Sequence, residues 1–414
     1  PDSYRQYDFL DGAYPQLEID DDEIEEYNDD PRRDKYGHGT HIAGIITGDG
    51  VDSDGEFRGT SDGASLFALR VLDDKGEGQA SDTIAAVDWL LQYADTLDIR
   101  VVNMSLGKGI SESNTTDPLV QAVEALWDSG VVIVAAAGNL GTGGNFTIKS
   151  PGNSRKIITV GSLTDNATGS DFSDDYVSSF SSRGPSAGDL VLKPDLVAPG
   201  NRVVATMDKY AKLRNDMPNN IVQCSKSGCD SEYLSLSGTS MATPMVAAAV
   251  SLMLQKDPTL SPATVKARLM RSARKIEGVS PMDIGAGVLD IDAAMSDTGV
   301  VTGDALSPLV TPDTVNGGVL VEDTGSLWGD TTWASGYLWS DGYLWADNGM
   351  QADGNLWADG YLWADGYLWA DGYLWADGYL WADGYLWADS IQGADPFVEK
   401  AKGNKITLND DDPE

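Results

Sequence analysis

The chain has 414 residues, enough for two or three domains with a large buried core and too many for a miniprotein held together by disulfides. Its 65 Asp and Glu residues against 28 Lys and Arg residues give a formal charge of -37, and this net field repels the phosphate backbone of nucleic acids. The longest strongly apolar run, residues 245–254, is far shorter than the roughly 20 residues that a membrane-spanning helix needs.

The chain opens with PDSYRQYDFL, which has neither an initiator methionine nor the basic and apolar pattern of a signal peptide. We therefore expect that an upstream segment is missing from this sequence.

From about residue 36 to residue 296, short β-branched runs alternate with amphipathic segments of helical period. This pattern predicts an α/β fold with three layers, in which helices flank a parallel sheet. Near-continuous apolar strands are expected at 100–105, 131–137 and 157–162, because helices cover both faces of such a sheet. Helices are expected to begin after Asp117 and after Ser261, where a capping residue precedes a proline in the first turn.

The composition changes after about residue 296. Residues 297–325 are expected to form a linker, and the hexapeptide ADGYLW then recurs through 326–390, before an acidic tail over 391–414. In an extended strand, Tyr and Trp of each unit share one face and Leu takes the other. One interpretation is an ordered β-array in which stacked units bury a common core, and the alternative is a low-complexity segment that stays disordered or self-associates.

Aspartate makes up 52 of the 65 acidic residues. Asp favours turns and caps, so this bias points either to loops that bind hard cations such as calcium or to an acidic surface adapted to high salt. The two cysteines, Cys224 and Cys229, fit either a small disulfide in an exported protein or a pair of free thiols.

The two histidines of the chain, His38 and His41, lie in the segment GHGTHIAG. Their spacing could hold a metal ion, but the motif supplies no third ligand and no glutamate between them. A structural histidine is the simpler interpretation for at least one of them.

Two further segments carry groups suited to catalysis. In LSGTSMATP, Ser240 stands at the start of an alanine-rich helix, where it is either a helix cap or a nucleophile with His38 as its base. In AAAGN, Asn139 follows an apolar strand and offers an amide donor at the carboxyl edge of the sheet, unless it only forms a turn.

Six segments within roughly residues 1–296 occur in one order and spacing: YGHGTHIAG, VVNMSLG, AAAGN, SSFSSRGP, KPDLVAPG and GTSMATP. As a set they resemble the subtilisin-like serine proteases, or subtilases, of the peptidase S8 family. The resemblance implies a subtilisin-like peptidase domain over residues 1–296, with a sheet flanked by helices.

The resemblance implies that Ser240 is the acylating nucleophile and His38 its general base. It implies that Asn139 donates a hydrogen bond to the developing oxyanion, together with the backbone amide of Ser240. His41 is then structural. The implied substrate-binding residues are Ser105, Leu106 and Gly107, which form an exposed strand edge, and Gly138 from AAAGN. Residues 76–78 are implied to form the opposite wall.

The front of the chain departs from the family pattern. Subtilases carry the triad aspartate in a DTG segment before the histidine, whereas this chain begins with the segment that follows it, YDFLDG at 7–12. Asp8 and Asp11 belong to that later segment and are rejected as substitutes. We therefore expect an amino-terminal truncation that removes the triad aspartate and the first strand, leaving little activity and a damaged edge of the core.

Two details also follow from the resemblance. Asp34, four residues before His38, corresponds to a structural acidic position, and the Ser150–Pro151 bond is expected to be cis.

The expected function is that of a secreted serine endopeptidase, which hydrolyses the peptide bonds of polypeptides through an acyl-enzyme. The alternative is a catalytically inert surface or polymer-binding protein that uses the Trp-rich repeat. The chemistry requires no cofactor, and structural calcium fits both the family and the excess of aspartate, although no metal-binding residues can be assigned. Contact between the repeat and a cell surface or polymer stays open.

Overall fold

The structure is a computed structural model that describes residues 4–16, 34–169, 171–225, 233–276 and 279–312, and beyond them only the backbone of strands between residues 319 and 393. The expected acidic tail over 391–414 lies almost wholly outside these residues. The helices are α1 (His38–Thr47), α2 (Ala80–Tyr93), α3 (Pro118–Asp128), α4 (Lys212–Asp216), α5 (Thr239–Lys256), α6 (Pro262–Ser272), α7 (Pro281–Ile284) and α8 (Ile291–Ser296).

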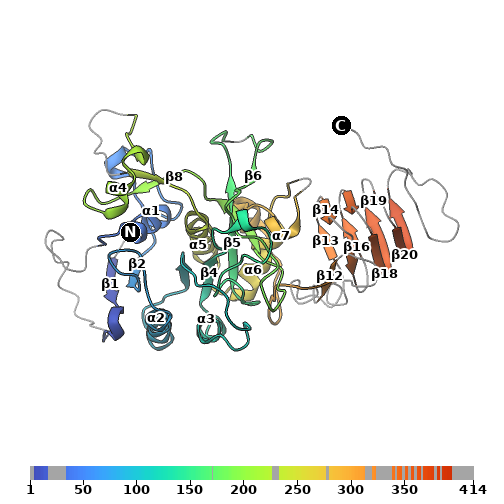
Figure 1. Ribbon diagram of the computed structural model, residues 1–414, viewed down its shortest axis with the longest axis horizontal. Helices are drawn as coiled ribbons and strands as arrows, with labels where there is room; N and C mark the ends of the chain where they lie inside the picture. The colour runs from blue at the N-terminus through green and yellow to red at the C-terminus, as the bar shows by residue number, and fades with distance from the viewer. Residues whose placement is uncertain are drawn as a thin grey trace.

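A five-stranded sheet forms the centre of the molecule (Figure 1). Its strands are β3 (Val101–Met104), β4 (Val132–Ala136), β5 (Ile158–Thr164), β7 (Leu196–Pro199) and β6 (Tyr176–Val177). The first four are parallel, and β6 pairs antiparallel with β5. The strands expected at 100–105, 131–137 and 157–162 are confirmed as β3, β4 and β5.

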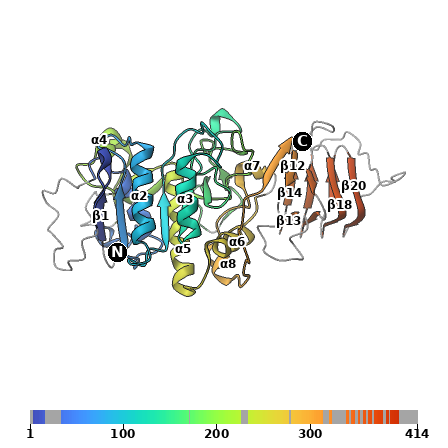
Figure 2. The same ribbon diagram turned by 90° about the horizontal axis from the view of Figure 1, so that it is seen from below.

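Helices cover both faces of this sheet. Helices α1 and α5 lie on one side of the strands, while α2 and α3 lie on the other (Figures 1 and 2). All five residues of β4 are buried, as are Val246 and Val250 of α5 and Val123 of α3, which belong to the same apolar cluster. This double cover explains why the strand sequences are almost entirely apolar.

Both expected helix starts are confirmed. The Asp117 carboxylate accepts a hydrogen bond from the backbone N–H of Leu119 over 3.0 Å at the start of α3, and the Ser261 hydroxyl accepts one from Thr264 N–H over 3.2 Å at the start of α6. These contacts satisfy backbone donors that the first helical turn leaves without partners.

The sheet is interrupted between two strands that flank α2 in the chain. Strands β1 (Tyr4–Asp8) and β2 (Leu66–Arg70) form a separate parallel pair. Within the described residues, β2 pairs with β1 alone and β3 pairs with β4 alone. Leu69 of β2 and Val102 of β3 nevertheless pack against the same apolar cluster. The break therefore lies between β2 and β3, and the expected damage to an edge of the core stays a prediction.

A small antiparallel sheet packs against α1. Its strands follow the order β8 (Val203–Thr206), β10 (Tyr233–Leu236) and β9 (Ile221–Val222). Cys224, just beyond β9, is disulfide-bonded, and Cys229 lies outside the described residues.

The beginning of the expected linker is packed onto the peptidase-like part. Ala305, Ser307 and Val310 are buried, and the backbone N–H of Leu192 donates to the carbonyl oxygen of Pro308 over 2.8 Å. Strand β11 (Leu309–Pro312) then pairs with β12 (Val319–Glu322).

The described strands of the repeat pair in parallel with an offset of 18 residues, which becomes 17 where residues 373–376 pair with residues 390–393. Trp339 aligns with Trp357 and Trp357 with Trp375, so each hexapeptide pairs with the third one after it. The strands are β13 (Leu338–Ser340), β14 (Tyr343–Ala346), β15 (Met350–Ala352), β16 (Leu356–Ala358), β17 (Tyr361–Ala364), β18 (Tyr367–Ala376), β19 (Leu380–Ala382) and β20 (Tyr385–Gly393).

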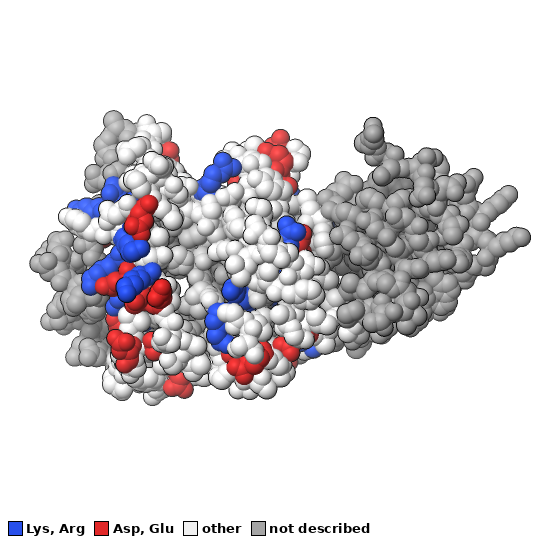
Figure 3. Space-filling view, in the orientation of Figure 1, with Lys and Arg blue, Asp and Glu red and all other residues white. Residues whose placement is uncertain are grey.

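Across the described part of the chain, no helix combines the length and the apolar character needed to cross a membrane. Figure 3 shows that charged side chains on one face gather over the end that carries β1 and β2, and that further charged groups lie scattered over the middle of the described part.

Candidate active site

His38 and Ser240 stand at the beginnings of two neighbouring helices. His38 is the first residue of α1, and Ser240 is the second residue of α5. Ile42, one turn into α1, and Met241, which follows Ser240, belong to one apolar cluster. The packing of these two helices thus places both side chains at the same end of the α1–α5 pair.

The Ser240 hydroxyl donates to the backbone carbonyl oxygen of Ser105 over 3.3 Å. The Ser105 hydroxyl in turn donates to the carbonyl oxygen of Ser240 over 2.8 Å. Among the described residues, no hydrogen bond joins His38 to Ser240. The serine hydroxyl therefore rests against the end of β3.

Asn139 is held at the start of α5 by its side-chain oxygen. Its Oδ1 accepts hydrogen bonds from the backbone N–H of Thr239 over 2.9 Å and from the Thr239 hydroxyl over 3.0 Å. Because this atom accepts from two donors, it is the amide oxygen, and the other terminal atom of the Asn139 side chain is the nitrogen Nδ2. Nδ2 lies 3.3 Å from the position that a Cβ at Gly238 would take, which places this donor beside the first turn of α5.

Sequence reasoning gave Thr239 no role beyond a small residue before Ser240. In the structure its hydroxyl also accepts a hydrogen bond from the backbone N–H of Gly138 over 3.2 Å. Thr239 thus connects the end of β4 to the start of α5 and orients Asn139. Its place next to Ser240 in GTSMATP was the only available signal, because its partners lie about one hundred residues away in the sequence.

The four residues assigned to substrate binding lie at the carboxyl ends of β3 and β4. Ser105 contacts Ser240 as described, and Leu106 is partly buried against the main apolar cluster. Gly107 and Gly138 both lie against the side chain of Lys149. On another wall, Gly76 packs against the ring of Tyr36, two residues before His38.

The electrostatic surroundings of His38 favour the neutral imidazole. Burial lowers its pKa below the ordinary value of 6.5, and the charge of Asp34 opposes this shift. The Asp34 carboxylate is occupied by backbone N–H groups, accepting from Gly37 and Thr40 over 2.8 Å each. Asp34 therefore caps the beginning of α1. A neutral imidazole is the form that can accept a proton.

His41 is fully buried within α1. Its Nε2 donates to the carbonyl oxygen of Leu234 over 2.9 Å, and burial lowers its pKa to about 4. This ring connects α1 to β10 and faces the protein interior.

The remaining features singled out from the sequence take no part in the contacts described around Ser240. Asp8, at the end of β1, forms an ion pair with Arg70 over 2.6 Å. Asp11 is exposed and has a left-handed conformation, with φ of 57°. The expected cis bond between Ser150 and Pro151 is confirmed. Among the described residues, no group of three His, Cys, Asp or Glu side chains could hold a metal ion.

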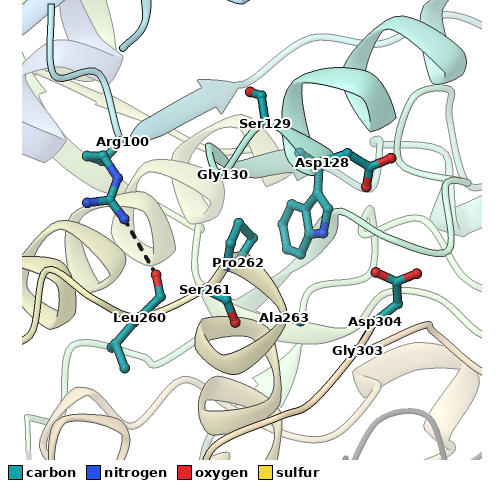
Figure 4. Close-up of a pocket in the computed structure, with 11 residues that line it drawn as sticks. Arg100, Asp128, Ser129, Gly130, Leu260, Ser261, Pro262, Ala263, Gly303 and Asp304 are labelled. Carbon is teal, nitrogen blue, oxygen red and sulfur yellow. Dashed lines mark hydrogen bonds between the residues drawn. The ribbon is translucent and has the colours of Figure 1, made fainter.

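A cavity of about 350 Å³ lies at the opposite edge of the sheet (Figure 4). Its lining includes Arg100 and Gly130, which precede β3 and β4, and the start of α6. Arg100 donates to the carbonyl oxygen of Leu260 across one side of it. Sites in α/β proteins form at the carboxyl ends of parallel strands, and this cavity lies at the amino ends, away from His38 and Ser240.

Comparison with known proteins matches residues 5–299 to the subtilase family, Peptidase_S8. The serine protease AprX of Bacillus subtilis (strain 168) is 40% identical over 264 residues, which are 63% of this chain and 58% of AprX. Subtilisin DY of Bacillus licheniformis is 35% identical over 65% of this chain and 80% of its own length. The solved structure of sphericase is similar with a TM-score of 0.53 and 27% identity, covering 69% of this chain and 84% of that one.

This chain therefore spans little more than half of AprX, and the matched segment contains all of α1 to α8. The parallel sheet, the helices on its two faces and the serine at the start of α5 fall within that segment. On this match and this architecture, the chain belongs to the subtilase family.

Proposed function

We propose that the chain is a serine endopeptidase that cleaves polypeptides at the α1–α5 end of the molecule. The observation that supports this most directly is the arrangement at the start of α5, where Asn139 is fixed through Oδ1 beside Ser240. The N-terminus of α5 adds backbone N–H groups and the positive end of an 18-residue helix.

The proposed reaction uses these groups in sequence. Ser240 Oγ attacks the carbonyl carbon of the scissile bond while His38 accepts the hydroxyl proton. The charge on the former carbonyl oxygen is stabilised by Asn139 Nδ2 and the Ser240 N–H. His38 then protonates the leaving amine, and water, deprotonated by His38, releases the acyl group from Ser240.

His38 needs an orienting carboxylate that the described residues do not supply. Asp34 is engaged by backbone N–H groups, and Asp8 is paired with Arg70. The interruption between β2 and β3 is the place in the fold where a further strand fits. We propose that a segment carrying an aspartate completes the site there, and that without it the reaction is slow.

A fluorophosphonate probe, which reacts with activated serines, tests this function. The comparison is between this polypeptide and a version with an added amino-terminal strand that ends in Asp-Thr-Gly. We expect the probe to label Ser240 faster in the extended version, and Ser240→Ala and His38→Ala to abolish labelling. Absence of label at Ser240 in the extended version would overturn the proposal and favour the inert, polymer-binding alternative.

We also propose an extracellular location, since a disulfide at Cys224 is expected to persist in an oxidising compartment. Recovery of the protein from the culture medium, with Cys224 blocked to thiol reagents until reduction, tests this location. Retention of a free Cys224 thiol inside the cells would contradict it.

A further inference from the structure

We propose that Lys149 makes this site selective for an acidic side chain, Asp or Glu, in the residue whose carbonyl group is attacked. The inference rests on the proposed function, because it concerns the peptide that Ser240 would cleave. It is carried by the position of Lys149 between two segments of the site and by the absence of a partner for its charge within the part of the chain that the structure describes.

Lys149 is held between the segments that follow β3 and β4. Its backbone N–H donates to the carbonyl oxygen of Ala137 over 2.9 Å. The next residue, Ser150, exchanges backbone hydrogen bonds with Lys108 in both directions, at 2.9 and 3.0 Å. These contacts insert residues 149–150 between the end of β3, which contacts Ser240, and the end of β4, which carries Asn139.

Two glycines make room for the Lys149 side chain. A Cβ at Gly138 would lie 2.7 Å from Lys149 Cγ, and a Cβ at Gly107 would lie 3.0 Å from Lys149 Cβ. The first distance is shorter than real Cβ atoms show, so any other residue at position 138 would displace the lysine. The aliphatic part of the Lys149 side chain thus forms one wall of the proposed site together with Gly107 and Gly138. Gly138 directly precedes Asn139 in the chain.

The ammonium group of Lys149 forms no hydrogen bond or ion pair with any residue that the structure describes, and the side chain is half-buried. The neighbouring lysine differs, because Lys108 pairs with the buried carboxylate of Asp117 over 2.6 Å. A cation without a partner among the described residues, next to the glycine that precedes Asn139, is notable in a chain with a net charge of -37, where carboxylates are abundant. A substrate carboxylate would supply the missing partner.

The position of the oxyanion donor decides which substrate residue meets this wall. A peptide that places its carbonyl oxygen at Asn139 Nδ2 brings the side chain of the same residue next to Gly138 and Lys149. A charge that is complementary to Lys149 favours that peptide over an uncharged one of equal size, and the partial shielding from water strengthens the pair.

Binding to an uncleavable form of the protein tests the inference independently of turnover. Two fluorescent peptides that differ only in Glu or Gln at this position are titrated against the Ser240→Ala variant of the full chain. We expect the Glu peptide to bind about tenfold more tightly, a difference that falls with added salt. Adding Lys149→Gln should bring the ratio close to one, and Lys149→Glu should favour a Lys peptide instead.

Lys212→Gln is the matched control, since it removes the same charge from an exposed residue of α4 that pairs with Asp216. It should keep the tenfold ratio. Equal affinities for the Glu and Gln peptides, or a ratio that survives Lys149→Gln, would overturn the role of Lys149 and leave the proposed function intact. Failure of both peptides to bind, together with no fluorophosphonate label in the extended version, would overturn both.

Discussion

At the scale of single residues, the hydroxyl of Thr239 orients Asn139, and its removal is the sharpest test of this positioning role. Thr239→Val keeps the volume but loses the bonds to Asn139 Oδ1 and from Gly138 N–H. Because the backbone N–H of Thr239 still holds Asn139, we expect the rate of Ser240 labelling by fluorophosphonate to fall about tenfold.

Thr239→Ser should restore the rate. Thr243→Val is the control, because the hydroxyl of Thr243, one turn later, donates only to the carbonyl oxygen of Thr239. Asn139→Ala should cost more, in the range of about 10²–10³ known for an oxyanion-hole donor in subtilisin. Unchanged labelling in Thr239→Val would show that Asn139 is held by the backbone alone.

The two histidines provide a second test at this scale, because proton NMR of the chain contains only two imidazole titrations. Burial lowers the pKa of His41 to about 4 and lowers that of His38 below 6.5. Between pH 6.5 and 4, the unfolded chain binds more protons than the folded chain. The free energy of unfolding should therefore fall on acidification, by roughly 3 kcal/mol from His41 alone.

We expect one imidazole to titrate near pH 4 and to disappear from the spectrum of His41→Gln. The unfolding free energy of that variant should depend less on pH over this interval. Titration of both rings near 6.5 would contradict the burial of His41.

At the scale of secondary-structure elements, a buried ionic cluster connects α6, β7 and the chain after α8. Asp195 is fully buried with Lys193 at 2.7 Å and Lys266 at 3.4 Å, and Lys266 also donates to the Ser307 hydroxyl over 2.8 Å. One carboxylate balances only one of two ammonium groups. Desolvation accordingly lowers the pKa of Lys266 to about 7.

Lys266→Met should destabilise the fold by about 3 kcal/mol at pH 7, since it leaves carbonyl groups near β5 without their donor. From pH 7 to 10 the unfolded chain keeps the Lys266 proton that the folded chain has lost, so the unfolding free energy of the parent should rise. Urea unfolding at several pH values should show a larger rise in the parent than in the variant, which keeps Lys193, whose pKa desolvation also lowers.

Lys256→Met is the control for this experiment, because Lys256, the last residue of α5, is exposed and donates to a single carbonyl group, that of Met295 in α8. It should change stability by less than about 1 kcal/mol and leave the pH dependence intact. An identical pH dependence in Lys266→Met would assign the effect to other groups.

How far the sequence predicted these elements depends on whether their signals were local. Strands β3 to β5 and the starts of α3 and α6 follow from apolar runs and from capping residues beside the prolines. The interruption between β2 and β3 depends on which strands pair, and pairing is not encoded within either strand. The contacts of Thr239 and Lys149 arise in the same way, because the partners are distant in the sequence.

At the scale of the whole molecule, the repeat has a regularity that the sequence pattern alone left open. An offset of 18 residues aligns Trp positions with Trp positions and Tyr positions with Tyr positions in neighbouring strands, except where residues 373–376 pair with residues 390–393 at an offset of 17. Parallel stacking of this kind is characteristic of solenoids, in which each repeat contacts only its neighbours. Consecutive units are not paired with each other as hairpins in the described strands, although Asp-Gly is a strong hairpin signal.

The boundary between the peptidase-like part and the repeat can be located by truncation. Residues 297–325 were expected to be a linker, yet Ser307 contacts Asp195 and Lys266, and Ala305 and Val310 are buried. In a chain that ends at residue 312, the residues before the repeat should therefore unfold at the same temperature as they do in the full chain. A chain that ends at residue 300 should lose roughly 5 kcal/mol, through lost apolar burial and buried hydrogen bonds.

Thermal unfolding followed by circular dichroism measures both truncations, and Ser307→Ala in the full chain separates the hydrogen bonds from the apolar contacts. In the chain that ends at residue 300, the ionic cluster of Lys193, Asp195 and Lys266 should also become more accessible to solvent, because Ser307 closes it on one side. Equal unfolding temperatures for the chains that end at 300 and 312 would return the boundary to residue 296, and would make residues 301–310 a passive connection to the repeat.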